Sequence, residues 1–164
     1  MCTFTIIRIG QSGYRLGFNR DELRTRELGE PPVHRRVGQR RAIMPVDPVS
    51  GGTWLGVNDA GVSFALLNVY TADPRAPKVR GQRQSRGRII PSLLGHDTAA
   101  AAARRAGKLP VAAYPPFTLL CCDPATAIRW RWDGLHFECE EHPRADWPVL
   151  YTSSGMGDHL VEAG

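Results

Sequence analysis

The chain has 164 residues, of which 42% are hydrophobic and 23% charged, and a formal net charge of +5 at pH 7. These values predict one soluble domain with a buried core, and the chain lacks an apolar run of the roughly 20 residues that a membrane-spanning helix needs. The first residues carry neither the basic start nor the long apolar stretch of a signal peptide, so we expect no membrane span and a cytoplasmic location.

The N-terminal part begins with two apolar runs rich in β-forming residues, 2–9 and 13–18, which predict a β-hairpin. In an antiparallel hairpin the start of the first strand lies beside the end of the second. The polar and charged residues 19–22 are therefore expected to lie near Cys2. Residues 26–50 carry four prolines among scattered charges and predict a long loop.

The middle of the chain predicts a second pair of strands and one helix. Residues 53–57 and 62–69 are strand-like on either side of a tight-turn sequence, and the glycine pair before them indicates a close backbone approach or a positive φ angle. The alanine-rich segment 98–106 predicts a helix that Asp97 caps and Gly107 ends.

The rest of the chain predicts further strands, at 117–122, 127–132, 134–139 and 149–152. Hairpins with one clear helix indicate an α+β domain with a mostly antiparallel sheet.

Arginine dominates the basic residues, since the chain holds 19 arginines and 2 lysines. Six basic residues fall between positions 75 and 88, and no acidic residue lies between Asp73 and Asp97. Such a segment is typical of a solvated loop, and it also suits phosphate groups or another acidic ligand. No nucleic-acid reading module or aromatic platform accompanies it, so we predict no nucleic-acid partner.

Cysteine follows the initiator methionine directly. Met1 is normally removed when the next residue is small, and its removal would leave Cys2 with a thiol and a free α-amine. The thiol is a nucleophile and the amine is a base, which is the arrangement of an N-terminal nucleophile. Any small residue can also stand at position 2. The other cysteines, Cys121, Cys122 and Cys139, show no disulfide framework and no strong metal-binding motif, so we predict no metal site.

Six short motifs lie in order along the chain: Met1-Cys2, Phe18–Glu22, Gly-Gly-Thr-Trp-Leu-Gly-Val at 51–57, Ala-Leu-Leu-Asn at 65–68, Ser-Arg-Gly at 85–87 and Thr-Ser-Ser-Gly at 152–155. In combination they resemble the NRDE family, also called the transport and Golgi organisation protein 2 family, over residues 2 to about 160. The resemblance implies a fold like that of the N-terminal-nucleophile hydrolases, an αββα sandwich of mostly antiparallel sheets. Family members usually continue beyond the last motif, so it also implies a single domain over residues 1–164 that lacks C-terminal elements.

The Met-Cys-Thr start is also similar to choloylglycine hydrolases and penicillin V acylases. By this resemblance the catalytic residues are Cys2, Arg20, Asp21 and Asn68. Cys2 would attack an amide, ester or thioester carbonyl of a small molecule, and Asp21 would hold the α-amine. Arg20 would stabilise the thiolate or orient a substrate carboxylate, and Asn68 would donate to the oxyanion. Structural roles stay open: an ion pair that closes the hairpin for Arg20 and Asp21, a turn or strand end for Asn68. Trp54 is expected in the core.

The alternative is a non-catalytic protein that binds and moves haem or a lipid or acyl-coenzyme A, because the family is associated with both. The basic segment 75–88 would then suit haem propionates or coenzyme phosphates, and Cys2, His96 or His136 would be candidate iron ligands. The hydrolase interpretation requires no cofactor. An interaction module is the third interpretation, and neither the oligomeric state nor the substrate follows from the sequence.

Overall fold

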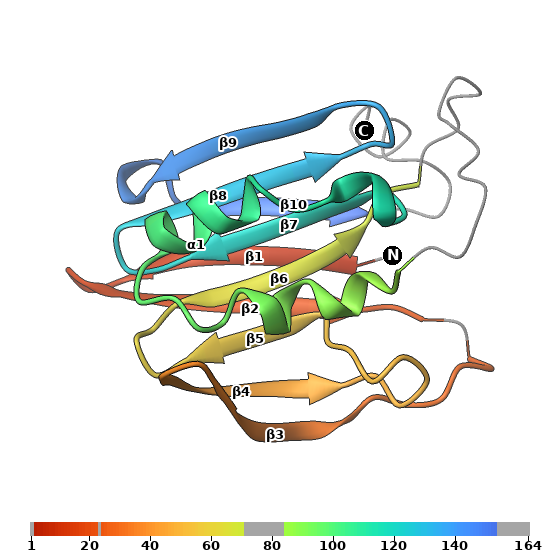
Figure 1. Ribbon diagram of the computed structural model, residues 1–164. Coiled ribbons are helices and arrows are strands. Elements are labelled where there is room, and N and C mark those ends of the chain that lie inside the picture. Colours follow the sequence, from red (N-terminus) through yellow and green to blue (C-terminus); the bar gives the residue numbers. More distant parts are fainter. Residues whose placement is uncertain (1, 23, 71–83, 154–164) are drawn as a thin grey trace.

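The computed structural model describes residues 2–22, 24–70 and 84–153, in which ten strands form two antiparallel sheets that stack face to face (Figure 1). The small sheet has the order β10-β1-β2, and the large sheet has the order β3-β4-β5-β6-β7-β8-β9. The strands are Cys2–Ile9 (β1), Gly13–Arg20 (β2), Glu30–Val37 (β3), Arg40–Val46 (β4), Leu55–Asn58 (β5), Ser63–Asn68 (β6), Phe117–Cys122 (β7), Thr126–Trp132 (β8), Phe137–Pro143 (β9) and Val149–Ser153 (β10). The mostly antiparallel fold that the sequence predicts is confirmed.

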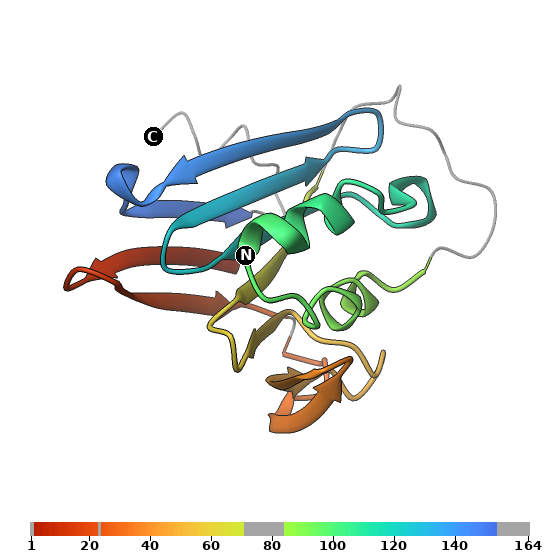
Figure 2. The ribbon, with the colours of Figure 1, turned by 60° about the vertical axis from the view of Figure 1, so that its left-hand side comes forward.

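Helical structure in the described residues is limited to one helix and short turns. Helix α1 spans Ala99–Ala106, and 3₁₀ turns span Arg86–Arg88, Ile90–Ser92, Val111–Ala113 and Arg144–Asp146. Helix α1 and the first two of these turns cover one face of the large sheet, whereas the small sheet covers the other face (Figures 1 and 2). None of these helices is long and apolar enough to cross a membrane.

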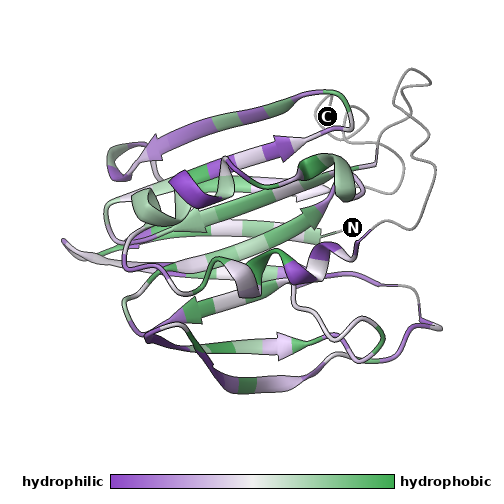
Figure 3. Cartoon of the chain, viewed as in Figure 1, coloured by the Kyte–Doolittle hydropathy of each residue, from purple (hydrophilic) through white to green (hydrophobic). Residues whose placement is uncertain are grey.

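The central strands of the large sheet are apolar on both faces, because each face packs against its own core (Figure 3). Between the sheets, buried side chains come from both sheets and from Trp147: Phe4, Ile6, Ala65, Leu67, Leu120 and Cys122. On the other face, side chains of the large sheet meet those of the helical segment: Phe64, Leu119, Ile90, Leu93, Leu94, Ala99, Ala102 and Ala106.

The N-terminal hairpin forms as predicted, and its register places Cys2 opposite Arg20. Alternate residues of β2 face the interior of the sandwich and are half-buried: Tyr14, Leu16, Phe18 and Arg20. One face of this strand therefore runs from an aromatic and aliphatic end to a charged end.

The predicted long loop at 26–50 is wrong, since it contains the β3–β4 hairpin. Pro31 and Pro32 lie on an edge strand beside a shift in the β3–β4 register, and an edge strand tolerates residues that cannot donate a backbone hydrogen bond. Gly38 turns the chain with a φ of 60°. Strand β4 is held by alternate buried side chains: Ala42, Met44 and Val46.

Two other boundaries differ from the prediction. Thr98, not Asp97, caps α1, because its Oγ1 accepts a hydrogen bond from the Ala101 N–H at 3.1 Å. Asp97 instead accepts a bond from Arg40 Nε at 2.7 Å. The strand predicted at 134–139 begins only at Phe137 as β9, since the turn before it uses the positive φ of Gly134, 104°. Gly107 ends α1 as expected.

Candidate active site

A polar pocket of about 130 Å³ lies where β1 begins and β2 ends. It contains three of the four residues that the sequence singles out, Cys2, Arg20 and Asn68. Its other lining residues come from the ends of neighbouring strands and from two loops: Glu22, Arg26, Asp47, Ser50, Thr53, Trp54, Leu66, Ser85, Arg86 and Gly87.

Cys2 is a free, half-buried cysteine between two strands. Its register partners are Arg20 on β2 and Ser153 on β10. The Cys2 backbone nitrogen donates a hydrogen bond to Ser153 Oγ at 3.3 Å, and Ser153 is only 2% exposed. Ser153 therefore contacts the atom that becomes the α-amine once Met1 is removed. Sequence reasoning assigned no role to Ser153, although this residue lies within the Thr-Ser-Ser-Gly motif.

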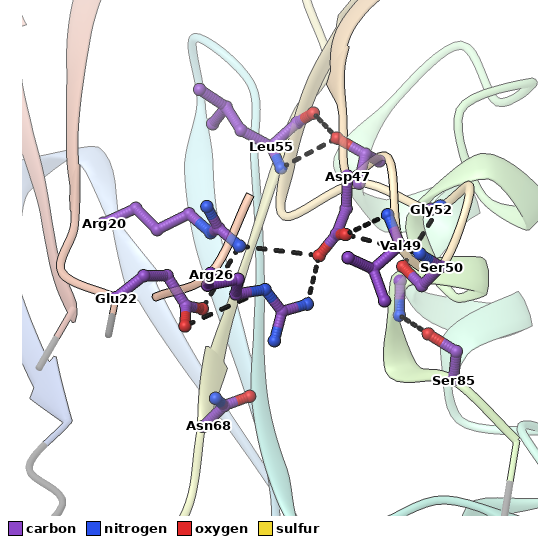
Figure 4. Close-up of polar contacts among 12 residues, drawn as sticks. Arg20, Glu22, Arg26, Asp47, Val49, Ser50, Gly52, Leu55, Asn68 and Ser85 are labelled. Carbon is purple, nitrogen blue, oxygen red and sulfur yellow. Dashed lines mark hydrogen bonds and ion pairs between the residues drawn. The ribbon is translucent and has the colours of Figure 1, made fainter. Parts of the chain in front are cut away.

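Arg20 is held in place by two carboxylates (Figure 4) and by one aromatic ring. Its Nη2 lies 3.2 Å from Glu22 Oε1 and 3.4 Å from Asp47 Oδ2, and its guanidinium carbon lies 4.2 Å from the centre of the Trp54 ring. Arg26 Nη2 reaches the same Asp47 oxygen at 2.5 Å. The expectation that Trp54 lies in the core is wrong. Its half-buried ring lines the pocket and stacks on Arg20.

Asp47 is the centre of this network, which we call the Arg20–Asp47–Arg26 network. Its second oxygen accepts hydrogen bonds from the backbone N–H groups of Val49 at 3.0 Å and Ser50 at 3.3 Å. Burial acts to raise the pKa of Asp47, but the hydrogen bond and charge of Arg26 and the two backbone N–H groups hold the pKa below its usual value. The carboxylate is thus ionised at neutral pH and orients both arginines. Because Asp47 lies in the segment that the sequence predicts as a loop, no signal pointed to it.

Asp21 is placed differently from the expectation. Strand β2 ends at Arg20, and Asp21 is exposed, where it accepts a hydrogen bond from Asn19 Nδ2 at 2.9 Å. It is not among the residues that line the pocket. In an extended chain successive side chains point to opposite faces, so Arg20 and Asp21 do not both face inward. That Asp21 holds the α-amine stays a prediction, and the described contact to the Cys2 nitrogen comes from Ser153.

Asn68 lines the pocket at the end of β6. Alternate residues of a strand share one face, so the Asn68 side chain is on the same side of β6 as those of Phe64 and Leu66. These two side chains pack on the helix-covered side of the large sheet. Asn68 Nδ2 donates to Tyr70 Oη at 3.3 Å. This bond uses one of the two N–H donors of the Asn68 amide, so donation to an oxyanion does not require the bond to Tyr70 to break.

Two of the glycine-containing motifs meet at the wall of the pocket. Gly51 has a φ of 64°, and a Cβ on Gly52 would lie 2.6 Å from the carbonyl carbon of Gly87. The Thr53 N–H donates to Gly87 O at 3.0 Å. Both readings of the glycine pair, a positive φ and a close backbone approach, are confirmed.

Among the described residues, three arginines (Arg20, Arg26 and Arg86) and two carboxylates (Glu22 and Asp47) line the pocket, which leaves an excess of one positive charge. Arg86 donates to Pro116 O at 2.7 Å, which fixes its direction. A free α-ammonium at Cys2 would add to this excess. The pocket is therefore suited to a ligand with a negative charge or a carbonyl that becomes negative during reaction.

The residues considered for haem or metal lie elsewhere. Neither His96 nor His136 lines the pocket, and His136 Nδ1 lies 3.4 Å from Asp133 Oδ2. Among the described residues, no group of three or more His, Cys, Asp and Glu side chains is arranged to hold a metal ion. Most of the basic segment, 75–83, lies outside the described residues.

Comparison with known proteins agrees with the motifs and the fold. No curated protein shows significant similarity to the chain. Among solved structures, penicillin V acylase from Agrobacterium tumefaciens is similar with a TM-score of 0.57 and 14% sequence identity, over 99% of this chain and 55% of that chain. The chain thus spans about half the length of the acylase, and the likeness shows a fold of the N-terminal-nucleophile hydrolase type. Residues 1–136 match the family model described as Transport and Golgi organisation 2, and the chain belongs to this family.

Proposed function

We propose that the protein hydrolyses, or transfers the acyl group from, an amide, ester or thioester of a small molecule through Cys2. The observation that carries this proposal is the pair of contacts around Cys2: the thiol-bearing residue shares a pocket with the anchored Arg20, and its nitrogen is bonded to Ser153. A nucleophile next to its own base, with a fixed cation nearby, is the arrangement that acyl transfer needs.

In the proposed reaction the α-amine, freed by removal of Met1, accepts the thiol proton while Cys2 Sγ attacks the carbonyl carbon. The bond from that carbon to the leaving nitrogen, oxygen or sulfur breaks, and the leaving atom takes the proton from the ammonium. Water then attacks the resulting thioester and passes a proton to the amine. The bond from the acyl carbon to Cys2 Sγ then breaks, the ammonium returns its proton to the sulfur, and the acid product leaves.

Other residues would assist these steps. Arg20 would stabilise the thiolate or hold a substrate carboxylate, because Asp47 and Glu22 fix its position without neutralising the pocket. Ser153 Oγ would orient the α-amine towards the thiol. The Asn68 amide would donate to the oxyanion, a contact worth about 2.7–4 kcal/mol in sites of this kind.

Intact mass spectrometry during turnover of activated esters and thioesters tests the proposal. We expect an acyl adduct on wild-type protein that peptide mapping assigns to Cys2, and no adduct on Cys2→Ala. Cys139→Ala is the matched control, because Cys139 is an exposed cysteine outside the pocket. Adducts that persist in Cys2→Ala would contradict catalysis through Cys2.

A paired substitution tests the role of Ser153. Ser153→Ala removes the oxygen that accepts from the Cys2 nitrogen, and we expect slower adduct formation with a changed pH dependence. Ser153→Thr keeps a hydroxyl oxygen and should restore the wild-type rate of adduct formation. Thr152→Ala is the control, since Thr152 is its exposed neighbour on the opposite face of β10. Equal rates in all three variants would exclude a role for Ser153.

The alternative is a carrier of haem or acyl-coenzyme A on the same scaffold, with no catalysis. The observation in its favour is the positive pocket, whose arginines suit propionate or phosphate groups. A haem carrier is expected to show a stoichiometric Soret band that survives gel filtration and is lost in Arg20→Gln. Absence of that band, together with a Cys2 adduct, would exclude this alternative.

A further inference from the structure

A second and larger cavity, of about 490 Å³, lies at the opposite end of β2 from Cys2. We call it the β2–β5 cleft. On one side it is lined by Tyr14 and Leu16, and on the other by residues of β4 and β5 that include Ile43, Leu55 and Val57. None of its lining residues lines the Cys2 pocket.

The cleft results from the unequal width of the two sheets. On β4 and β5, alternate residues such as Met44 and Gly56 are buried towards the helical segment, where Gly56 approaches Leu94. The residues between them, Ile43 and Val57 among others, face the small sheet and are only half-buried. The small sheet ends at β2 in the described residues, so β4 and β5 extend beyond its edge. An apolar, concave surface is left there.

The chemistry of the lining indicates an uncharged ligand. Among the described residues, no Asp, Glu, Lys or Arg lines the cleft, so a charged group there would lose its hydration without gaining a counter-charge. The polar side chains are the hydroxyls of Tyr14 and Ser63, which bond to each other at 2.7 Å, and Tyr14 Oη also donates to Gly61 O at 2.7 Å. Burial raises the pKa of Tyr14, which keeps it neutral. Both hydroxyl protons are therefore used within the protein, so these oxygens can only accept a hydrogen bond from a ligand.

The dimensions indicate a compact ligand. The lining covers three consecutive residues on each of β4 and β5, from Ile43 to Pro45 and from Leu55 to Val57. At about 3.3 Å per residue this is a length of about 10 Å along the strands. The volume falls in the range of roughly 300–1,000 Å³ of small-molecule sites. A ring-containing molecule fills such a space better than an extended chain.

We propose that the β2–β5 cleft is a binding site for a neutral, compact hydrophobic molecule of one to a few rings. This site is separate from the Cys2 pocket and does not depend on the proposed chemistry there. Its physical basis is the burial of half-exposed apolar side chains, which releases water from both the cleft and the ligand.

Fluorescence titration with N-phenyl-1-naphthylamine, a neutral ring-containing probe, tests the proposal. We expect saturable binding with one probe per chain. Ile43→Trp should weaken it at least tenfold by filling the cleft, and Val57→Lys should weaken it similarly by adding a charge. These positions are half-buried, so both variants are expected to fold, which circular dichroism checks. Leu150→Lys is the matched control, because Leu150 is an apolar residue that is 61% exposed outside the cleft.

Cys2→Ser should bind the probe as wild-type does, which separates this site from the proposed active site. The proposal is overturned if binding does not saturate, or if Ile43→Trp and Val57→Lys bind as tightly as Leu150→Lys. It is also overturned if sedimentation shows that a second copy of the chain covers the cleft and that these two variants only change that association.

Discussion

The two ends of β2 have opposite chemistry although they belong to one face of one strand. At the Cys2 end, Arg20 is held by Asp47, Glu22 and the Trp54 ring in a small polar pocket. At the other end, Tyr14 and Leu16 line a larger apolar cleft, in which the described part of the chain places no charged side chain. The polar end is defined by specific ion pairs and backbone donors, whereas the apolar end is defined by where one sheet stops above another. The first is therefore sensitive to single polar substitutions and the second to changes of volume.

The largest expected effect is on the polar end. Asp47→Ala removes the acceptor for Arg20, Arg26 and two backbone N–H groups, and we expect a loss of about 3 kcal/mol in the free energy of unfolding. Urea denaturation measures it. Asp59→Ala, which removes a carboxylate paired with Arg40 and Arg41 at the surface, should cost much less. Equal losses would mean that the Arg20–Asp47–Arg26 network is no more than a surface ion pair.

Forcing apart the two loops of the pocket wall should have the next largest effect on stability. Gly52→Ala places a Cβ 2.6 Å from the backbone of Gly87, so the two loops must separate. We expect a loss of about 2 kcal/mol in the free energy of unfolding, typical of overpacking. Gly17→Ala is the control, since a Cβ there meets no atom within 4 Å. Chemical denaturation of both variants checks the difference, and a neutral Gly52→Ala would contradict the close approach.

Acidification should lower the free energy of unfolding by a smaller amount than Asp47→Ala does. Protonation removes the Asp47 charge but leaves the side chain in place. The pKa of Asp47 is lowered in the folded protein, so its contribution to stability is present above its unfolded pKa. That contribution is lost as the pH falls from about 5 through the lowered folded value. Denaturation as a function of pH should show this loss in wild-type, and Asp47→Asn should show a flatter dependence.

The smallest effect is expected at the apolar end. Tyr14→Phe removes a hydroxyl bonded to Gly61 O and Ser63 Oγ, and we expect a cost of about 1 kcal/mol in stability. Thermal unfolding measures it. Probe binding to the β2–β5 cleft should be retained, because the aromatic ring remains. Loss of binding in this variant would show that the hydroxyl, and not the apolar surface, holds the ligand.

The same contrast explains how much the sequence could predict. The alternation along 2–9 and 13–18 identifies the hairpin, and antiparallel pairing brings Arg20 beside Cys2. The hairpin at 30–46 was missed, because prolines normally exclude a strand and only its position at a sheet edge permits them.

Within the site, local motifs named Cys2, Arg20 and Asn68 but not their partners. Asp47 and Ser153 come close to Arg20 and Cys2 only through pairing between distant strands and the packing of a loop. The direction of Asp21 depends on the residue at which β2 ends, which the sequence does not mark. The β2–β5 cleft has no motif, since it arises from the relative width of two sheets.

The measurement that tests the central claim most directly is the alkylation rate of each cysteine at pH 7, read by peptide mass spectrometry on purified protein. Burial raises the pKa of Cys121 and raises that of Cys122 to about 12, and partial burial raises the pKa of the exposed Cys139. These three should therefore react slowly as thiols. We predict a clipped N-terminus and a Cys2 that reacts far faster than Cys139. A retained Met1, or a Cys2 no faster than Cys139, would contradict a nucleophile activated by its own α-amine.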